Sequence, residues 1–111
     1  MSRTLAELMA DFERVSRLYV DRCGIERDAD WFVLKLQEEL GELVQAHLRL
    51  TGRGRVKGEG AEALRRQFED ECADLLGQLL LLANRYDVDL ELAARRKWFR
   101  YLEPSGQAGS D

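Results

Sequence analysis

The sequence predicts an all-α protein that folds as a single four-helix bundle. Its 111 residues suffice for one domain with one core, and 45% of them are hydrophobic. The only proline is Pro104, so the first hundred residues are free to be helical. Apolar residues recur at helical spacings of three and four in four segments, and no segment alternates with the period of two that is typical of a strand. Short connections between such helices favour a bundle.

The first helix is expected from about Thr4 to Cys23, where Gly24 provides a stop signal. Its apolar residues lie three or four positions apart, which places them on one face of the helix. This stripe consists of Leu5, Leu8, Phe12, Val15 and Tyr19.

The second helix is expected from near Asp30 to near Gly52, with Asp28 or Asp30 as its N-terminal cap. Its apolar stripe is broken by an acidic residue. The stripe consists of Leu36, Glu39 or Leu40, Leu43, Ala46 and Leu50.

The third helix is expected from about Ala61 to Tyr86, and a turn over 87–89 separates it from a fourth helix that begins at Leu90. The stripe of the third helix consists of Leu64, Phe68, Cys72, Leu75, Leu79, Leu82 and Tyr86. The fourth carries Leu90, Ala93, Ala94, Trp98 and Tyr101 or Leu102.

The connection between the second and third helices, 51–60, contains four glycines and three cations, so a mobile, basic loop is expected there. Residues 103–111 are rich in Gly, Ser and polar residues, which predicts a disordered tail. The domain organisation is therefore one helical domain over 1–102, followed by that tail.

Composition excludes several classes of partner. The net charge of −4 and a pI near 5.1 argue against a protein that binds duplex nucleic acid, which usually has a basic excess. The longest apolar stretch, 75–83, is too short to span a bilayer. The charged N-terminus does not resemble a signal peptide, and the two cysteines form no metal or disulfide spacing. We expect a cytoplasmic protein with reduced thiols.

Two pairs of acidic residues occupy unusual positions. Glu39 and Glu42 share one face of the second helix, and Glu71 and Asp74 share one face of the third, because each pair is three residues apart. Glu39 interrupts an apolar stripe and Glu71 borders one, yet an ionised carboxylate near a core costs several kcal/mol unless it is paired.

Basic residues near these acids do not supply that pairing. Lys35 is the one cation three or four residues from any of the four acids, and its order relative to Glu39 is the less favourable one. A hard divalent cation would resolve the repulsion, since Mg²⁺ or Mn²⁺ suits a site made of oxygen ligands. The alternative is a solvated acidic face whose spacing is fortuitous.

Two glycines lie inside the same helices, close to the acids. Gly41 and Gly77 each cost about 1 kcal/mol relative to alanine in a helix. Either a neighbouring backbone or a bulky ligand approaches closely there, or the glycines serve ordinary helix packing.

The acidic motifs resemble those of a known family. EELGE over 38–42 is an EExxE pattern and ECAD over 71–74 is an ExxD pattern, and a basic helix follows. In this order and separation they resemble the MazG-like all-α nucleoside triphosphate pyrophosphohydrolases, over about residues 30–100.

The resemblance implies antiparallel second and third helices that pool their acids around Mg²⁺, and an assembly of two or four chains. It also implies hydrolysis of a nucleoside triphosphate between the α and β phosphates. The implied metal ligands are Glu39, Glu42, Glu71 and Asp74. Glu38 would orient or deprotonate the attacking water.

Substrate contacts are expected from residues outside the acidic motifs. Phosphate contacts would come from the fourth helix, where Lys97 is favoured, or from the loop; Lys35 is a further cation near the acids. The candidates are Arg95, Arg96, Lys97 and Arg100 on the helix and Arg53, Arg55 and Lys57 in the loop. Family members often carry an asparagine soon after the lysine of the fourth helix, and KWFRYLEP departs from that pattern. Trp31 is positioned either to stack on a base or to anchor a core or interface.

Three alternatives to this function remain open. The first is a phosphoribosyl-ATP pyrophosphohydrolase with a similar site. The second is a di-iron bundle, although its Glu-x-x-His motifs are absent and His47 lies five residues beyond Glu42. The third is a non-catalytic helical oligomer that binds a structural metal.

Overall fold

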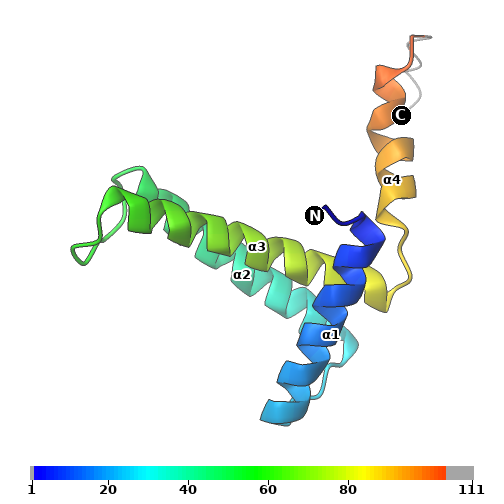
Figure 1. Cartoon of the computed structure of the whole chain (residues 1–111), viewed down its shortest axis with the longest axis horizontal. Helices are drawn as coiled ribbons and strands as arrows, with labels where there is room; N and C mark the ends of the chain where they lie inside the picture. The colour runs from blue at the N-terminus through cyan, green and yellow to red at the C-terminus, as the bar shows by residue number, and fades with distance from the viewer. Residues whose placement is uncertain (1, 105–111) are drawn as a thin grey trace.

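The computed structural model describes residues 2–104, and every regular element in that range is a helix (Figure 1). The four α-helices are α1 (Leu5–Cys23), α2 (Ala29–Leu50), α3 (Ala61–Arg85) and α4 (Leu90–Lys97), followed by a short 3-10 helix, η1 (Phe99–Leu102). The all-α prediction is confirmed. The fourth α-helix is shorter than expected, because the chain tightens into η1 after Trp98. Of the predicted tail, residues 105–111 lie outside the described range.

Local capping explains where the helices begin. Thr4 and Glu7 form a reciprocal capping box at the start of α1. The carboxylate of Asp28 accepts a hydrogen bond from the Trp31 amide, and Asp89 caps α4 in the same way. Gly24 ends α1 in the left-handed conformation, at φ 67°, which costs a glycine little. Within 2–104, no helix has both the length and the apolar character that a bilayer span requires.

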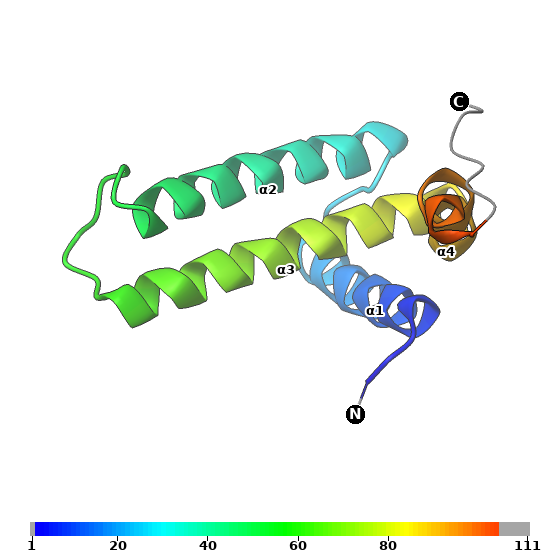
Figure 2. The ribbon, with the colours of Figure 1, turned by 90° about the horizontal axis from the view of Figure 1, so that it is seen from above.

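α2 and α3 form an antiparallel hairpin, and the loop 51–60 joins them at one end (Figures 1 and 2). α1 packs across α3 near the opposite end of the hairpin. α4 projects from the C-terminal end of α3, away from the hairpin (Figure 1). The four helices of one chain therefore do not lie alongside one another.

The buried core is small, and most of it lies where α1, the start of α2 and the end of α3 meet; the exception is Ala46, near the end of α2. Within the described range its apolar side chains are Val20, Phe32, Ala46, Leu80, Leu81 and Ala83. The predicted stripe of α2 is largely correct, because Leu36, Glu39, Leu43, Ala46 and Leu50 are all buried or half-buried.

The predicted stripe of α1 is partly wrong. Val15 is 64% exposed and Tyr19 is 53% exposed, whereas Ser16 and Val20 are buried. The buried face of α1 is therefore rotated about the helix axis relative to the predicted stripe, and an ion pair explains this difference. Arg27, which follows α1, donates to both carboxylate oxygens of Glu13 and to the Ser16 hydroxyl at 2.8–3.1 Å. These contacts turn the Glu13–Ser16 side of α1 inward.

The predicted stripe of α3 is also partly wrong. Cys72, Leu79 and Tyr86 are exposed, while Leu80, Leu81 and Ala83 are buried. The reason is that α3 packs against α2 on one side and α1 on another, so two faces of its C-terminal half are covered rather than one. The thiol of Cys72 is therefore not a core group.

Candidate functional site

The hairpin brings the predicted metal ligands together. Carboxylate oxygens of Glu39, Glu71 and Asp74 lie within 4.8 Å of one another, and so do those of Glu38, Glu39 and Glu42. Glu39 belongs to both groups. The two motifs, separated by about thirty residues of sequence, thus form one acidic cluster between α2 and α3.

Two oxygens of this cluster are buried without any hydrogen-bond partner, Oε1 of Glu39 and Oε1 of Glu71. Burial raises the pKa of Glu39, and the charges of Glu42 and Asp74 raise it further. The pKa of Glu71 is raised by burial and by the same two neighbours. Unsatisfied oxygens that repel one another are the arrangement that a divalent cation neutralises, so the donor set fits Mg²⁺ or Mn²⁺.

Glu38 occupies the exposed edge of the cluster. Lys35 donates a hydrogen bond to its Oε1 at 3.1 Å, and this contact raises the pKa of Lys35. The lysine therefore pairs with Glu38, not with Glu39 as the spacing of four residues suggested. Lys35 leaves the repulsion among Glu39, Glu71 and Asp74 largely uncompensated.

An aromatic cavity of about 340 Å³ opens beside the acids. Glu39, Asp74 and Lys35 line one side of it, so the cavity borders the cluster directly. Its other walls come from α1, the start of α2 and the end of α3. They include Phe12, Tyr19, Trp31, Gln78 and Leu81.

Trp31 packs edge-on against the buried Phe32, with ring centroids 5.1 Å apart, and lines the same cavity. This placement is compatible with both expectations for the residue, a core contact and access to a ligand. The Oε1 atom of Gln78 is buried without a hydrogen-bond partner, and Gln78 is one of the residues that line the cavity. Flat rings and an unpaired amide oxygen are groups that suit a planar, hydrogen-bonding ligand.

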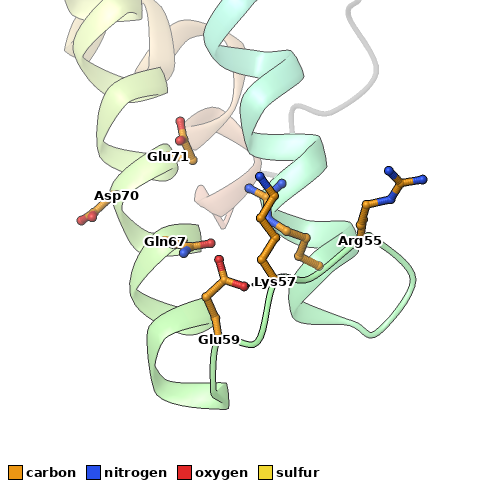
Figure 3. A pocket seen from close by; sticks show the side chains of 7 residues that line it. Arg55, Lys57, Glu59, Gln67, Asp70 and Glu71 are labelled. Carbon is orange, nitrogen blue, oxygen red and sulfur yellow. Dashed lines mark hydrogen bonds between the residues drawn. The ribbon is translucent and has the colours of Figure 1, made fainter.

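A second cavity, of about 360 Å³, lies on the loop side of the cluster (Figure 3). Glu71 lines it, and its cations are Arg49 from α2 and Arg55 and Lys57 from the loop. Arg49 was not among the predicted site residues, because at a helix C-terminus an arginine is ordinarily explained by the helix dipole.

The other predicted substrate cations lie elsewhere. Arg53 donates to the Thr51 hydroxyl at 3.2 Å and lines neither cavity. Arg96 and Lys97 lie on α4, which projects from the end of the hairpin opposite the loop. The structure of one chain does not bring these three residues to the acids. His47 is exposed, with its ring 6.4 Å from that of Phe68.

The two interior glycines have different surroundings. A Cβ atom at Gly77 would lie 2.6 Å from the Phe12 ring, so this glycine permits the close crossing of α1 over α3. A Cβ atom at Gly41 would meet nothing within 4 Å. Ordinary helix packing therefore accounts for Gly77, and no neighbour among the described residues accounts for Gly41.

Comparisons with protein-family models, with curated proteins and with solved structures found no match for this chain.

Proposed function

We propose that this protein is a Mg²⁺-dependent nucleoside triphosphate pyrophosphohydrolase that releases a nucleoside monophosphate and pyrophosphate. One observation carries the proposal: an acidic cluster with two unsatisfied buried oxygens lies between an aromatic cavity and a basic one. A nucleoside triphosphate has matching parts in the same order. Its base is planar and its two terminal phosphates are anionic, and the α–β phosphate bond to be cleaved lies between the base and those two phosphates.

The four acids Glu39, Glu42, Glu71 and Asp74 would hold the metal. When bound, Mg²⁺ neutralises the charge on the phosphate oxygens and so lowers the cost of nucleophilic attack at phosphorus. The protein contributes by holding the carboxylates in one place before the metal arrives. Helical spacing fixes each pair, and the antiparallel hairpin fixes one pair against the other.

Glu38 is the proposed general base, which accepts a proton from the attacking water. It borders the cluster through Glu39 and Glu42, yet remains exposed and accepts a hydrogen bond from Lys35. A carboxylate at this edge can accept a proton without occupying a buried ligand position. The hydrogen bond from Lys35 orients the Glu38 carboxylate, as a general base requires.

The aromatic cavity is the proposed base site. Trp31 and Tyr19 offer ring faces on which a base of any identity stacks. The free oxygen of Gln78 accepts a hydrogen bond from an exocyclic amine. Together these groups favour a nucleotide over inorganic polyphosphate.

The functional unit is proposed to be a homodimer or a larger homo-oligomer. The radius of gyration is 17.4 Å, against about 13 Å for a compact domain of this length. Large apolar side chains stay exposed on every α-helix, including Leu18 at 65% and, where α4 ends, Trp98 at 70%. Association of hairpins from two chains would complete a four-helix bundle, and would give α4 and its cations a neighbouring site to contact.

The protein is incubated with a panel of canonical and modified nucleoside triphosphates, with and without Mg²⁺. The release of pyrophosphate and of nucleoside monophosphate is measured. Release should require Mg²⁺. It should fall at least about 100-fold in Glu39→Gln and Asp74→Asn, since each removes a charged metal ligand. Glu38→Gln should keep Mg²⁺ affinity but lose most turnover.

The matched control is Glu69→Gln. Glu69 lies two residues before Glu71 but is exposed and pairs with Arg65 at 3.1 Å, outside the cluster. Its removal should leave turnover unchanged. Mg²⁺ binding without release from any nucleotide would refute the enzyme and favour a helical oligomer with a structural ion.

A further inference from the structure

The loop 51–60 is folded back onto the end of α2. The amides of Arg53 and Gly54 both donate to the carbonyl of Leu48, at 2.8 and 2.9 Å. A Cβ atom at Gly54 would lie 2.9 Å from the backbone nitrogen of Arg49, so the approach requires glycine. This packing holds the second half of the loop beside the Arg49 side chain, over the basic cavity.

A carboxylate of the chain itself occupies a cradle of donors in that cavity. Glu59 accepts a hydrogen bond from the Lys57 amide at 2.8 Å. Its pKa is lowered by backbone hydrogen bonds from its own amide and from Lys57, and further by the Gln67 side chain and the Arg49 charge. Figure 3 shows Glu59 and Gln67 directed toward Lys57, whereas Asp70 points away. The cradle therefore stabilises an anion.

The cradle is continuous with the acidic cluster. Glu71 contributes to both, because its carboxylate lines the cavity and lies within 4.8 Å of Glu39 and Asp74. The Arg49 charge partly offsets the rise in the pKa of Glu71 that burial and the neighbouring acids cause. Arg49 follows Glu42 by two helical turns, about 10 Å along α2, and a guanidinium on a long side chain spans much of that interval.

We propose that Arg49, Lys57 and Gln67 form a subsite for the two terminal phosphates of the substrate, and that Glu59 occupies this subsite when no substrate is bound. The inference rests on the proposed pyrophosphohydrolase function and extends it. It fixes the direction of binding, with the base toward Trp31 and the phosphate tail toward the loop. Pyrophosphate is then the product that stays in the cradle after hydrolysis.

The same donors serve Glu59 and the phosphates in turn. A phosphate oxygen replaces the Glu59 carboxylate at the Lys57 amide, and the displaced carboxylate becomes hydrated outside the cavity. Phosphate binds more strongly, because it carries more charge and more acceptor atoms than a carboxylate. Glu59 thus weakens pyrophosphate binding by competition.

The experiment measures the affinity of the full chain for inorganic pyrophosphate with Mg²⁺ present, by calorimetry and as product inhibition. Lys57→Gln and Arg49→Gln should weaken pyrophosphate binding about 10-fold or more, as expected for a lost charge-assisted contact. Glu59→Gln should strengthen it several-fold, because a competing anion is removed. Inhibition by nucleoside monophosphate should not change in any of the three.

The matched control is Arg66→Gln, which removes one exposed cation next to Gln67 in sequence but outside the basic cavity. It should leave pyrophosphate affinity unchanged. Mg²⁺ affinity is measured alone for every variant, because Arg49 also acts on Glu71. A fall in pyrophosphate affinity for Lys57→Gln at constant Mg²⁺ affinity supports the subsite.

Two results would separate this inference from the proposed function. Normal pyrophosphate binding in Lys57→Gln and Glu59→Gln, in an enzyme that hydrolyses triphosphates, would overturn the subsite and leave the function standing. Altered pyrophosphate binding in both variants, without hydrolysis of any nucleotide, would overturn the function and support the subsite.

Discussion

The Glu39 carboxylate lies in the apolar face of α2, with one buried oxygen that has no partner among the described residues. Other acids surround it, and the nearest lysine pairs with Glu38 instead. In the absence of metal, each ionised neighbour destabilises the folded chain. Repulsion of this kind is relieved when a cation binds, because the same charges then become ligands.

The burial of Glu39 and this repulsion together predict a pH dependence for the metal-free protein. The folded pKa of Glu39 is raised above the ordinary value of 4.5, so between these values the folded chain binds more protons than the unfolded chain. The destabilising contribution of Glu39 must therefore decrease as the pH falls from neutral toward the ordinary value. Glu39→Gln should be more stable than wild type at neutral pH, and the difference should shrink as the pH falls.

Thermal unfolding with chelator, from about pH 8 to about pH 5, measures this difference. At neutral pH, saturating Mg²⁺ should make wild type the more stable of the two proteins. The neutral amide of the Glu39→Gln variant is the poorer metal ligand, so Mg²⁺ binding stabilises wild type more. A difference between the two proteins that stays constant with pH in chelator would contradict the raised pKa.

At the scale of the element, neighbouring residues of α3 contribute both to the acidic cluster and to the packing against α1. Glu71 and Asp74 face the metal cluster, and one turn later Gly77 receives the Phe12 ring of α1. The crossing of α1 over α3 closes the aromatic cavity, which both helices line beside Asp74. Packing at Gly77 therefore shapes the proposed base site as well as the core.

Substituting the two interior glycines should have opposite effects. Gly77→Ala places a Cβ atom 2.6 Å from Phe12, so the helices must separate or the ring must move. Such overpacking costs about 1–3 kcal/mol. Gly41→Ala meets no neighbour within 4 Å, so it should gain up to about 1 kcal/mol of helix propensity.

Urea unfolding of both variants, metal-free and at one protein concentration, measures these changes. Equal free energies of unfolding for Gly77→Ala and wild type would mean that the close crossing is not required. A destabilised Gly41→Ala would mean that a partner chain covers this position.

At the scale of the whole molecule, the described residues extend over 52 × 38 × 31 Å, with α4 standing apart from the hairpin (Figure 1). Most buried apolar side chains of the described residues lie at the junction of α1, the start of α2 and the end of α3, and Ala46 lies farther along α2. Near the C-terminus, Trp98 and Leu102 are 70% and 80% exposed. Apolar surface of this extent is typical of an interface between subunits.

Sedimentation equilibrium at micromolar concentration should therefore give a mass of at least twice 12.8 kDa. Trp98→Glu should shift the protein toward the monomer, if α4 contributes to the contact as we propose. The matched control is Arg95→Gln on α4, where Arg95 is exposed and pairs with Glu91 at 2.7 Å. A wild-type chain that stays monomeric would contradict the proposed assembly.

The sequence by itself determined the helices and the acidic motifs. Both follow from local rules: caps such as Thr4 and Asp28, the absence of proline before Pro104, and the helical spacing that puts Glu39 beside Glu42 and Glu71 beside Asp74.

Only the tertiary structure decided how these elements meet. The Arg27–Glu13 contact holds the Glu13–Ser16 side of α1 inward, and the contact of α3 with both α2 and α1 buries residues outside its predicted stripe, such as Leu80. The cradle that Arg49, Lys57 and Gln67 form around Glu59 also depends on the fold of the loop. Periodicity specifies which residues share a face of one helix. It does not specify the angle at which two helices cross or where a glycine-rich loop returns, because those depend on contacts between residues far apart in sequence.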